Sequence, residues 1–274
     1  RLVYAQYAGR LDRTPAAILA VLLVVIALLI LGIEQRSRGR RAYHSRSMPA
    51  TSRPIPLSPR AKGLARLTLA TLVTAALIGP LATVAGWIIR GGSGTRAPSL
   101  DWGAAAGSVA GSALAALIAM AAAIPVATLV TRHRSAATAW LERAAYVVFS
   151  LPHIAVALGA VLLASRYLGG LYQSLTLLVA VYASVFFAQA LGPARAAMLQ
   201  VDPAIEEASQ SLGRGRLATM AAITMPLIRG GLLAGGLLVF LTTMKELPAT
   251  LLLRPTGFDT LAVDIWTATN DLLY

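Results

Sequence analysis

Residues 103–131 read Gly103-Ala-Ala-Ala-Gly-Ser-Val-Ala-Gly-Ser-Ala-Leu-Ala-Ala-Leu-Ile-Ala-Met-Ala-Ala-Ala-Ile-Pro-Val-Ala-Thr-Leu-Val-Thr131, a run without a single charged residue. A helix of roughly 20 apolar residues crosses a hydrocarbon core of about 30 Å, so this run is long enough to span a bilayer. Its many glycines and alanines let neighbouring helix backbones approach closely. The stretch therefore predicts a tightly packed transmembrane helix.

Other stretches along the chain resemble this one in length and composition. Hydrophobic residues make up 57% of the 274 and charged residues only 13%, a mix that a single water-soluble core could hardly bury. We therefore predict an all-α, polytopic transmembrane helical bundle. Prolines inside some spans are tolerable where packed neighbours satisfy the freed backbone groups. The expected spans are 15–33, 67–89, 103–131, 144–165, 171–190 and 228–246.

The charge distribution predicts an orientation. The net charge of +13 fits a nucleic-acid partner as well as a membrane. The densest basic run, however, lies in residues 34–66, between two apolar spans, as expected of a cytoplasmic loop. With 34–66, 132–143 and 191–227 inside, 16 of the 24 Lys and Arg fall on that side or at the next helix start. We expect the lipid bilayer as surroundings and no nucleic-acid partner.

Residues 191–227 form a longer segment than a simple connection needs. Asp202 is a plausible N-cap with Pro203 at the first helical position, and the carboxylates of Glu206 and Glu207 fall in the first turns, where the helix dipole favours them. Gly213 then ends this helix, and a second amphipathic stretch runs on towards Pro226. The segment predicts a short helix–turn–helix at the membrane surface, although an ordinary interfacial amphipathic helix would give a similar pattern.

The same segment carries a specific resemblance. Glu207-Ala208-Ser209, three residues, Gly213, nine residues, Ile223, one residue and Met225-Pro226 resemble the Glu-Ala-Ala…Gly…Ile-x-Leu-Pro signature of binding-protein-dependent ABC importer permeases. Ser209 and Met225 depart from it. The resemblance implies the type I permease fold and a coupling helix that docks on a dimeric ATP-binding-cassette ATPase. The expected coupling residues are Glu206, Glu207, Ala208, Ser209, Gly213, Ile223 and Pro226.

Residues 245–262 are similar to the ferric iron branch of these permeases, whose members are usually two fused repeats. The resemblance implies that 1–33 ends a first repeat, that 34–65 is a basic linker, and that 66–274 is a second repeat without its final helix. It further implies import of ferric iron, delivered by an external solute-binding protein. Related permeases carry thiamine, polyamines or oxyanions, and these substrates stay open. A start at Arg1, without an initiator Met, leads us to expect a piece of a longer chain.

Lys245, Glu246 and Pro248 form a candidate gate at the outer end of the last expected span. Adjacent charges near a membrane edge are costly unless they are hydrated, paired or buried against protein, and Pro248 hinders continuation of the helix. The Glu246 carboxylate is a hard oxygen ligand suited to Fe(III). In the alternative interpretation, Lys245 extends to lipid headgroups and Glu246 is merely solvated.

Two other function classes deserve comparison. Gly91-Gly92-Ser93-Gly94 matches the Gly-x-Ser-Gly of rhomboid-type serine proteases, with His153 in an apolar segment; we expect His153 instead to cap or pack at a proline-broken helix. An ion-coupled secondary transporter would use an intramembrane carboxylate such as Glu246. The chain has no cysteine, no phosphate-binding loop and no His pair with metal spacing. We expect a non-catalytic subunit without a cofactor; a metal site stays unknown.

Overall fold

The computed structural model describes residues 18, 21–29, 58–91, 101–133 and 135–270. Throughout these ranges the secondary structure is helical and no strand occurs, which confirms the all-α prediction. The chain divides into two units, one containing α3 and the other containing α4 to α13. Residue 18 and residues 21–29 are helical. The rest of the expected 15–33 span and most of the 34–65 linker lie outside the described residues.

Helix α3, Pro59–Gly91, is longer than the expected 67–89 span. It begins eight residues earlier because Ser58 accepts a hydrogen bond from the Ala61 amide and Pro59 occupies the first helical position, where its missing N–H costs nothing. The last residues of the expected 34–65 linker, from Pro59 onwards, are thus helical. Pro80 lies inside α3 without ending it.

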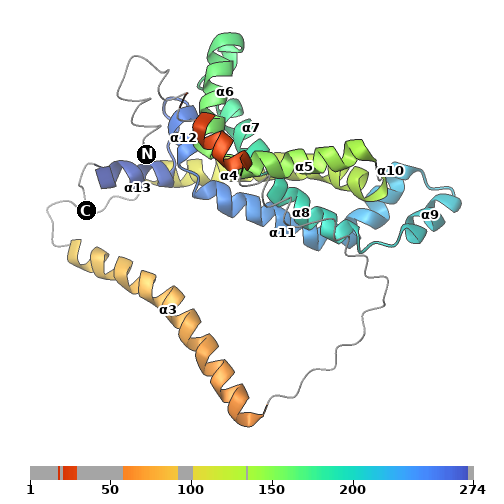
Figure 1. The fold of residues 1–274 in the computed structure, drawn as a ribbon, viewed down its shortest axis with the longest axis horizontal. Helices are drawn as coiled ribbons and strands as arrows, with labels where there is room; N and C mark the ends of the chain where they lie inside the picture. The colour runs from red at the N-terminus through yellow and green to blue at the C-terminus, as the bar shows by residue number, and fades with distance from the viewer. Residues whose placement is uncertain (1–17, 19–20, 30–57, 92–100, 134, 271–274) are drawn as a thin grey trace. The chain divides into compact units, whose positions relative to one another are not determined.

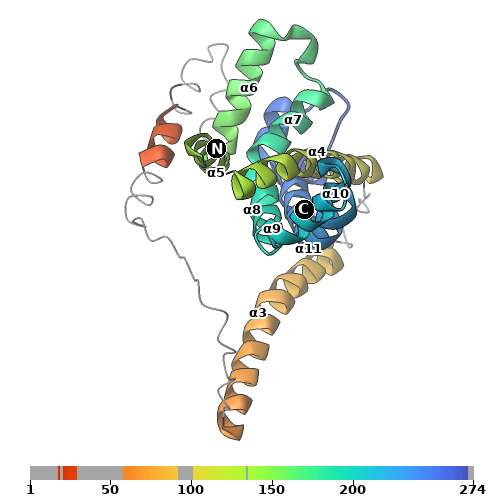
Figure 2. The ribbon, with the colours of Figure 1, turned by 90° about the vertical axis from the view of Figure 1, so that its right-hand side faces the viewer.

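The second unit is built around α4 (Trp102–Arg132), α8 (Phe187–Met198) and α11 (Met225–Met244), which pack against one another (Figures 1 and 2). Helix α4 matches the expected 103–131 span closely, because the Asp101 carboxylate accepts the amides of Gly103 and Ala104. A stripe of small side chains on α4 is fully buried in this contact: Ala115, Ala119, Ala123 and Ala127. Small residues thus set the helix spacing, as the sequence predicted.

Gly231 marks the closest approach of α11 to α8. A Cβ atom at Gly231 would lie 2.5 Å from the Ala197 Cβ and 2.7 Å from the Pro193 carbonyl oxygen. We therefore expect Gly231→Val to force the two helices apart and to cost about 1–3 kcal/mol of folding free energy. Gly230, its neighbour, has open space at the same position and provides the matched control. Equal melting temperatures for Gly231→Val and Gly230→Val would contradict this packing.

The expected single span 144–165 is two helices. Helix α5 (Ala136–Ser150) and helix α6 (His153–Tyr167) meet at 102°. The break lies at Pro152, which has no N–H to continue α5 and forces Leu151 into an extended conformation (φ −70°, ψ 148°). Helix α5 also begins earlier than expected, because Ser135 and Thr138 form a reciprocal capping box.

The expected span 171–190 is also divided. The turn η1 (Gly169–Leu171) precedes α7 (Leu175–Val185), which bends by 49° into α8 at Phe186. Helix α8 continues to Met198, so the loop that was expected to begin at residue 191 begins only after Met198. Leu191 and Ala194, on the buried side of α8, explain this continuation.

The remaining elements lie at the two ends of this unit. Between α8 and α11 are α9 (Pro203–Ser211), α10 (Arg216–Thr219) and the π-helical turn η2 (Met220–Thr224). Helices α12 (Pro248–Leu253) and α13 (Leu261–Asn270) follow α11. Segment 216–244 is one continuous helical span, so the expected start at residue 228 is wrong.

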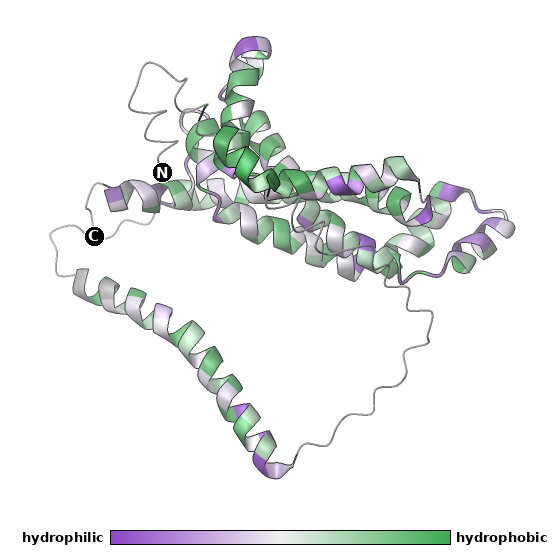
Figure 3. Ribbon diagram, viewed as in Figure 1, coloured by the Kyte–Doolittle hydropathy of each residue, from purple (hydrophilic) through white to green (hydrophobic). Residues whose placement is uncertain are grey.

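Three helical segments among the described residues are long and apolar enough to cross a membrane, or up to five if each bent pair counts as one span. The three are Pro59–Gly86, Trp102–Arg132 and Arg216–Met244. Large apolar side chains are exposed on α4 and α11, for example Leu117 and Leu233. Hydrophilic residues are concentrated around α9 and α10 (Figure 3). The second unit thus has apolar helices and a polar end formed by the helix–turn–helix.

Candidate coupling site and gate

The start of α9 agrees with the sequence prediction. The Asp202 side chain accepts a hydrogen bond from the Ala204 amide at 3.0 Å, and Pro203 occupies the first turn. Glu206 lies in that turn as well. A cap of this kind fixes where the helix begins, because it satisfies one of the amides that have no partner inside the helix.

The end of α9 depends on Gly213. Its φ of +87° lies in the left-handed region, as predicted. The Gly213 amide donates to the Gln210 carbonyl at 3.0 Å and the Arg214 amide donates to the Ser209 carbonyl at 3.3 Å. These two bonds form a Schellman motif, which closes the helix and reverses the chain towards α10.

The outer face of this helix–turn–helix is exposed. Glu207 and Ala208 are exposed. Leu212 and Leu217 are 86% and 87% exposed, which is unusual for leucines in a rigid turn. An exposed carboxylate and two exposed leucines on one helix–turn–helix are side chains suited to a protein partner.

The inner face of α9 is attached to the bundle. The Glu206 carboxylate lies 3.1 Å from Arg132 Nε at the end of α4 and accepts a hydrogen bond from Thr224. Ser209 and Thr219, both buried, share a hydrogen bond of 3.1 Å. Arg132, Thr219 and Thr224 escaped the sequence analysis. The sequence does carry one signal of this contact, because position 209 has a Ser, with a hydroxyl that can form a hydrogen bond, where the family signature has Ala.

We expect Ser209→Ala to destabilise the helix–turn–helix. The change restores the signature residue but leaves the buried Thr219 hydroxyl without the Ser209 oxygen, a loss of about 1 kcal/mol for one hydrogen bond. Chemical denaturation of wild type, Ser209→Ala and Ser209→Ala/Thr219→Val would measure it. The double variant should recover most of the loss, and a single variant as stable as wild type would contradict the contact.

Ile223 and Pro226 lie where the helix–turn–helix joins α11. Ile223 is part of the π-helical turn η2, in which the Met225 amide donates to the Met220 carbonyl. Pro226 has no amide to donate, so the wider π turn accommodates it without ending the helix. The signature Pro therefore marks a change of helix geometry rather than the boundary that the sequence suggested.

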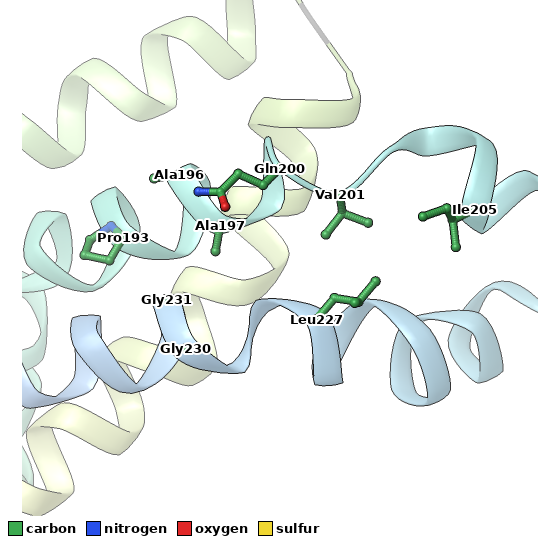
Figure 4. Close-up of a pocket in the computed structure, with 9 residues that line it drawn as sticks. All are labelled: Pro193, Ala196, Ala197, Gln200, Val201, Ile205, Leu227, Gly230 and Gly231. Atoms are coloured by element: carbon green, nitrogen blue, oxygen red, sulfur yellow. The ribbon is translucent and has the colours of Figure 1, made fainter. Parts of the chain in front are cut away.

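A groove of about 580 Å³ lies beside α9 and is lined by residues of α8, α9 and the start of α11 (Figure 4). Ile205 at one end and Leu227 on α11 point towards it, and glycines and alanines form its floor. Glu206 and Ser209 provide polar contacts between α9 and the bundle next to this groove.

Glu246, a candidate gate residue, is buried rather than solvated. Its carboxylate lies 2.9 Å from His153 Nδ1 and accepts the Ala249 amide at 3.2 Å; only 8% of the side chain is exposed. The Thr250 hydroxyl bonds to the Glu246 carbonyl and to the Tyr182 hydroxyl. The interpretation of Glu246 as a solvated anchor is therefore wrong, because its partners come from α6 and α12.

His153 is the first residue of α6, after the break at Pro152, and its ring packs edge-on against Phe186. This agrees with the expected capping or packing role. The His153–Glu246 contact thus joins the break between α5 and α6 to the break between α11 and α12. Sequence separation of 93 residues hides it from local pattern analysis.

The other candidate gate residues have simpler surroundings. Lys245 is exposed and caps α11, and Pro248 begins α12. Within the described ranges no group of three His, Cys, Asp or Glu side chains could hold a metal ion. Ser93, of the protease-like motif, lies outside the described residues.

Comparisons with known proteins agree with this arrangement. A family model described as "Binding-protein-dependent transport system inner membrane component" matches residues 122–272, from the middle of α4 through α13. The Fe(3+)-transport system permease protein FbpB 2 of Haemophilus influenzae is 30% identical over 278 residues, which cover 99% of this chain and 54% of that protein. The chain thus spans about half the length of this relative. With its transmembrane helices and its signature helix–turn–helix, the chain belongs to the family of binding-protein-dependent transport system inner membrane components.

Proposed function

We propose that this chain is part of the membrane-spanning permease of an ATP-binding-cassette importer. In this role an external binding protein delivers the substrate, the permease passes it to the cytoplasm, and ATP is hydrolysed by a partner ATPase dimer. The observation that carries the proposal is the helix–turn–helix at α9. A short helix capped at both ends, with Glu207 and two leucines exposed, can dock on a partner and move as a rigid body.

The different surroundings of the two faces of α9 indicate which face docks on the partner. Glu206 and Ser209 are engaged with the bundle, whereas Glu207, Ala208 and Leu212 are free for a partner. A displacement of α9 by the ATPase would reach α4 through Arg132 and α11 through Thr224. In the proposed orientation this end of the bundle faces the cytoplasm, in keeping with its basic residues.

Ferric iron is the proposed substrate, because the 30% identical relative is an Fe(3+)-transport permease. Glu246 and His153 supply oxygen and nitrogen atoms of the kind that iron accepts, close to two helix breaks. They are candidates for the substrate path rather than a binding site, since two groups that already pair with each other hold no ion tightly.

The test is uptake into vesicles that contain the permease, its ATPase and its binding protein. We expect radioactive Fe(III) to accumulate only with ATP inside and with the iron-loaded binding protein outside. Accumulation driven by an ion gradient without ATP would instead identify a secondary transporter. In that case the buried carboxylate of Glu246 would be the candidate ion-coupling group. Thiamine, a polyamine or an oxyanion that enters while iron does not would refute the substrate assignment alone.

A further inference from the structure

The polar contacts around α9 separate two adjacent carboxylates that the sequence treats alike. Arg132 is the last residue of α4, and Glu206 lies in the first turn of α9. Arg132 Nε is 3.1 Å from Glu206 Oε2, and its NH2 group donates to the Val201 carbonyl at 3.1 Å. Arg132 therefore contacts the chain on both sides of the α9 N-cap, whereas Glu207 points to the outside.

The second oxygen of Glu206 is engaged as well. Thr224 Oγ1, which is 1% exposed in the turn before α11, donates to Glu206 Oε1 at 2.8 Å. One carboxylate thus joins the end of α4 and the start of α11, two helices that pack against each other along the bundle. Any rotation of α9 relative to these helices has to break one of these contacts.

The surroundings of the pair make it effective. The side chains of Arg132 and Glu206 are each 17% exposed, so water and salt screen them less than a surface pair. The Thr224 hydroxyl also donates to the Glu206 carboxylate, and a hydrogen bond to a charged group is stronger than one between neutral groups. The groove beside α9 leaves few apolar contacts to do the same task.

We propose that Arg132 is a positioning residue that holds α9 in its docking orientation through Glu206, while Glu207 is the carboxylate that meets the partner. This assignment rests on the proposed function for its consequence, the coupling to an ATPase, but the clamp itself is a property of this chain. The clamp consists of Arg132, Glu206 and Thr224. Lysine at position 132 is a poor substitute, because an ammonium group lacks the planar fork with which Arg132 makes both of its contacts.

The first readout needs no partner. Hydrogen–deuterium exchange of the permease in lipid nanodiscs reports how often α9 opens. We expect the α9 amides to exchange about tenfold faster in Arg132→Gln and in Glu206→Gln than in wild type, as for loss of one charge-assisted contact. The exchange rate in Arg132→Lys should lie between the rates in wild type and in Arg132→Gln. Unchanged α9 exchange in Arg132→Gln would overturn the proposal; if that variant fails to insert, Arg132→Lys decides in the same way.

The matched control is an ion pair between two other helices. Arg195 Nε on α8 lies 3.2 Å from Glu142 Oε1 on α5, and neither residue belongs to α9 or to the group Arg132, Glu206 and Thr224. Arg195→Gln removes a comparable pair and should leave α9 exchange at the wild-type rate. An equal increase in this variant would mean general loosening of the bundle and would overturn a specific clamp.

The second readout separates the two carboxylates. With the ATPase subunit added, Glu207→Gln should weaken its binding about tenfold without changing α9 exchange. Glu206→Gln should retain most binding but lose stimulated ATP hydrolysis. The assignment of partner binding to Glu207 and of α9 orientation to Glu206 would be overturned by either of two results. One is faster α9 exchange in Glu207→Gln, and the other is ATPase binding that is weakened in Glu206→Gln but not in Glu207→Gln. If the wild-type permease binds no ATPase, the proposed function fails while the exchange experiment still decides the clamp.

Discussion

Gly213→Val should abolish ATPase coupling while leaving the transmembrane bundle intact. The residue closes α9 with a φ of +87°, and a β-branched side chain is disfavoured there by roughly 1–2 kcal/mol. The Schellman hydrogen bonds of Gly213 and Arg214 would be lost together, and the exposed Leu212 would leave its place beside Glu207. We expect stimulated ATP hydrolysis in reconstituted vesicles to fall by at least about tenfold.

The control for this variant is Gly215→Val. Gly215 has φ −66°, an ordinary value, and open space at its Cβ position, so a side chain fits without strain. This variant should keep most of the stimulated activity. Full activity in Gly213→Val, or an equal loss in both variants, would mean that the closure of α9 does not determine coupling.

Glu246→Gln should strongly reduce transport with a small effect on folding. The amide keeps the shape of the side chain and can still accept from Ala249, but it removes the charge that faces His153. We expect uptake in vesicles to fall about tenfold. Glu246→Ala should also unfold more easily, because Ala249 and His153 lose a buried partner, which costs about 1–3 kcal/mol per unsatisfied group.

Lys245→Gln is the neighbouring control. The Lys245 side chain is exposed, and the Glu246 carboxylate bonds to His153 and Ala249 instead, so loss of the Lys245 charge should leave transport close to wild type. His153→Ala should resemble Glu246→Gln if the pair acts as a unit. Wild-type uptake in Glu246→Gln would restrict Glu246 to a structural role and would place the gate elsewhere.

The parts of this structure that the sequence predicts are those that few consecutive residues determine. Asp202-Pro203 and Gly213 define the start and end of α9 because caps and left-handed turns are local. The apolar run 103–131 predicts α4 for the same reason. At Pro152 the sequence leaves two outcomes, a kink or a break, and the neighbouring packing decides for a break of 102°.

The site residues that the sequence misses have partners far along the chain. The sequence around Glu246 is compatible with a solvated or a buried carboxylate. Its partner His153 lies 93 residues away, so no local pattern connects the two residues. Arg132 is an ordinary basic residue at a span end until Glu206 lies beside it. Ser209 is an exception, because its departure from the family signature has a visible compensation in Thr219.

Affinity between the permease and its ATPase is the measurement that most directly tests whether the exposed face of α9 is a docking surface. Glu207→Lys reverses the charge of an exposed side chain near the start of α9, where the unfavourable helix-dipole interaction costs at most about 1 kcal/mol, so the bundle should stay folded. We expect wild type to retain the ATPase subunit through purification and Glu207→Lys to release it, with melting temperatures that agree. Equal retention of the ATPase by both proteins would contradict the account.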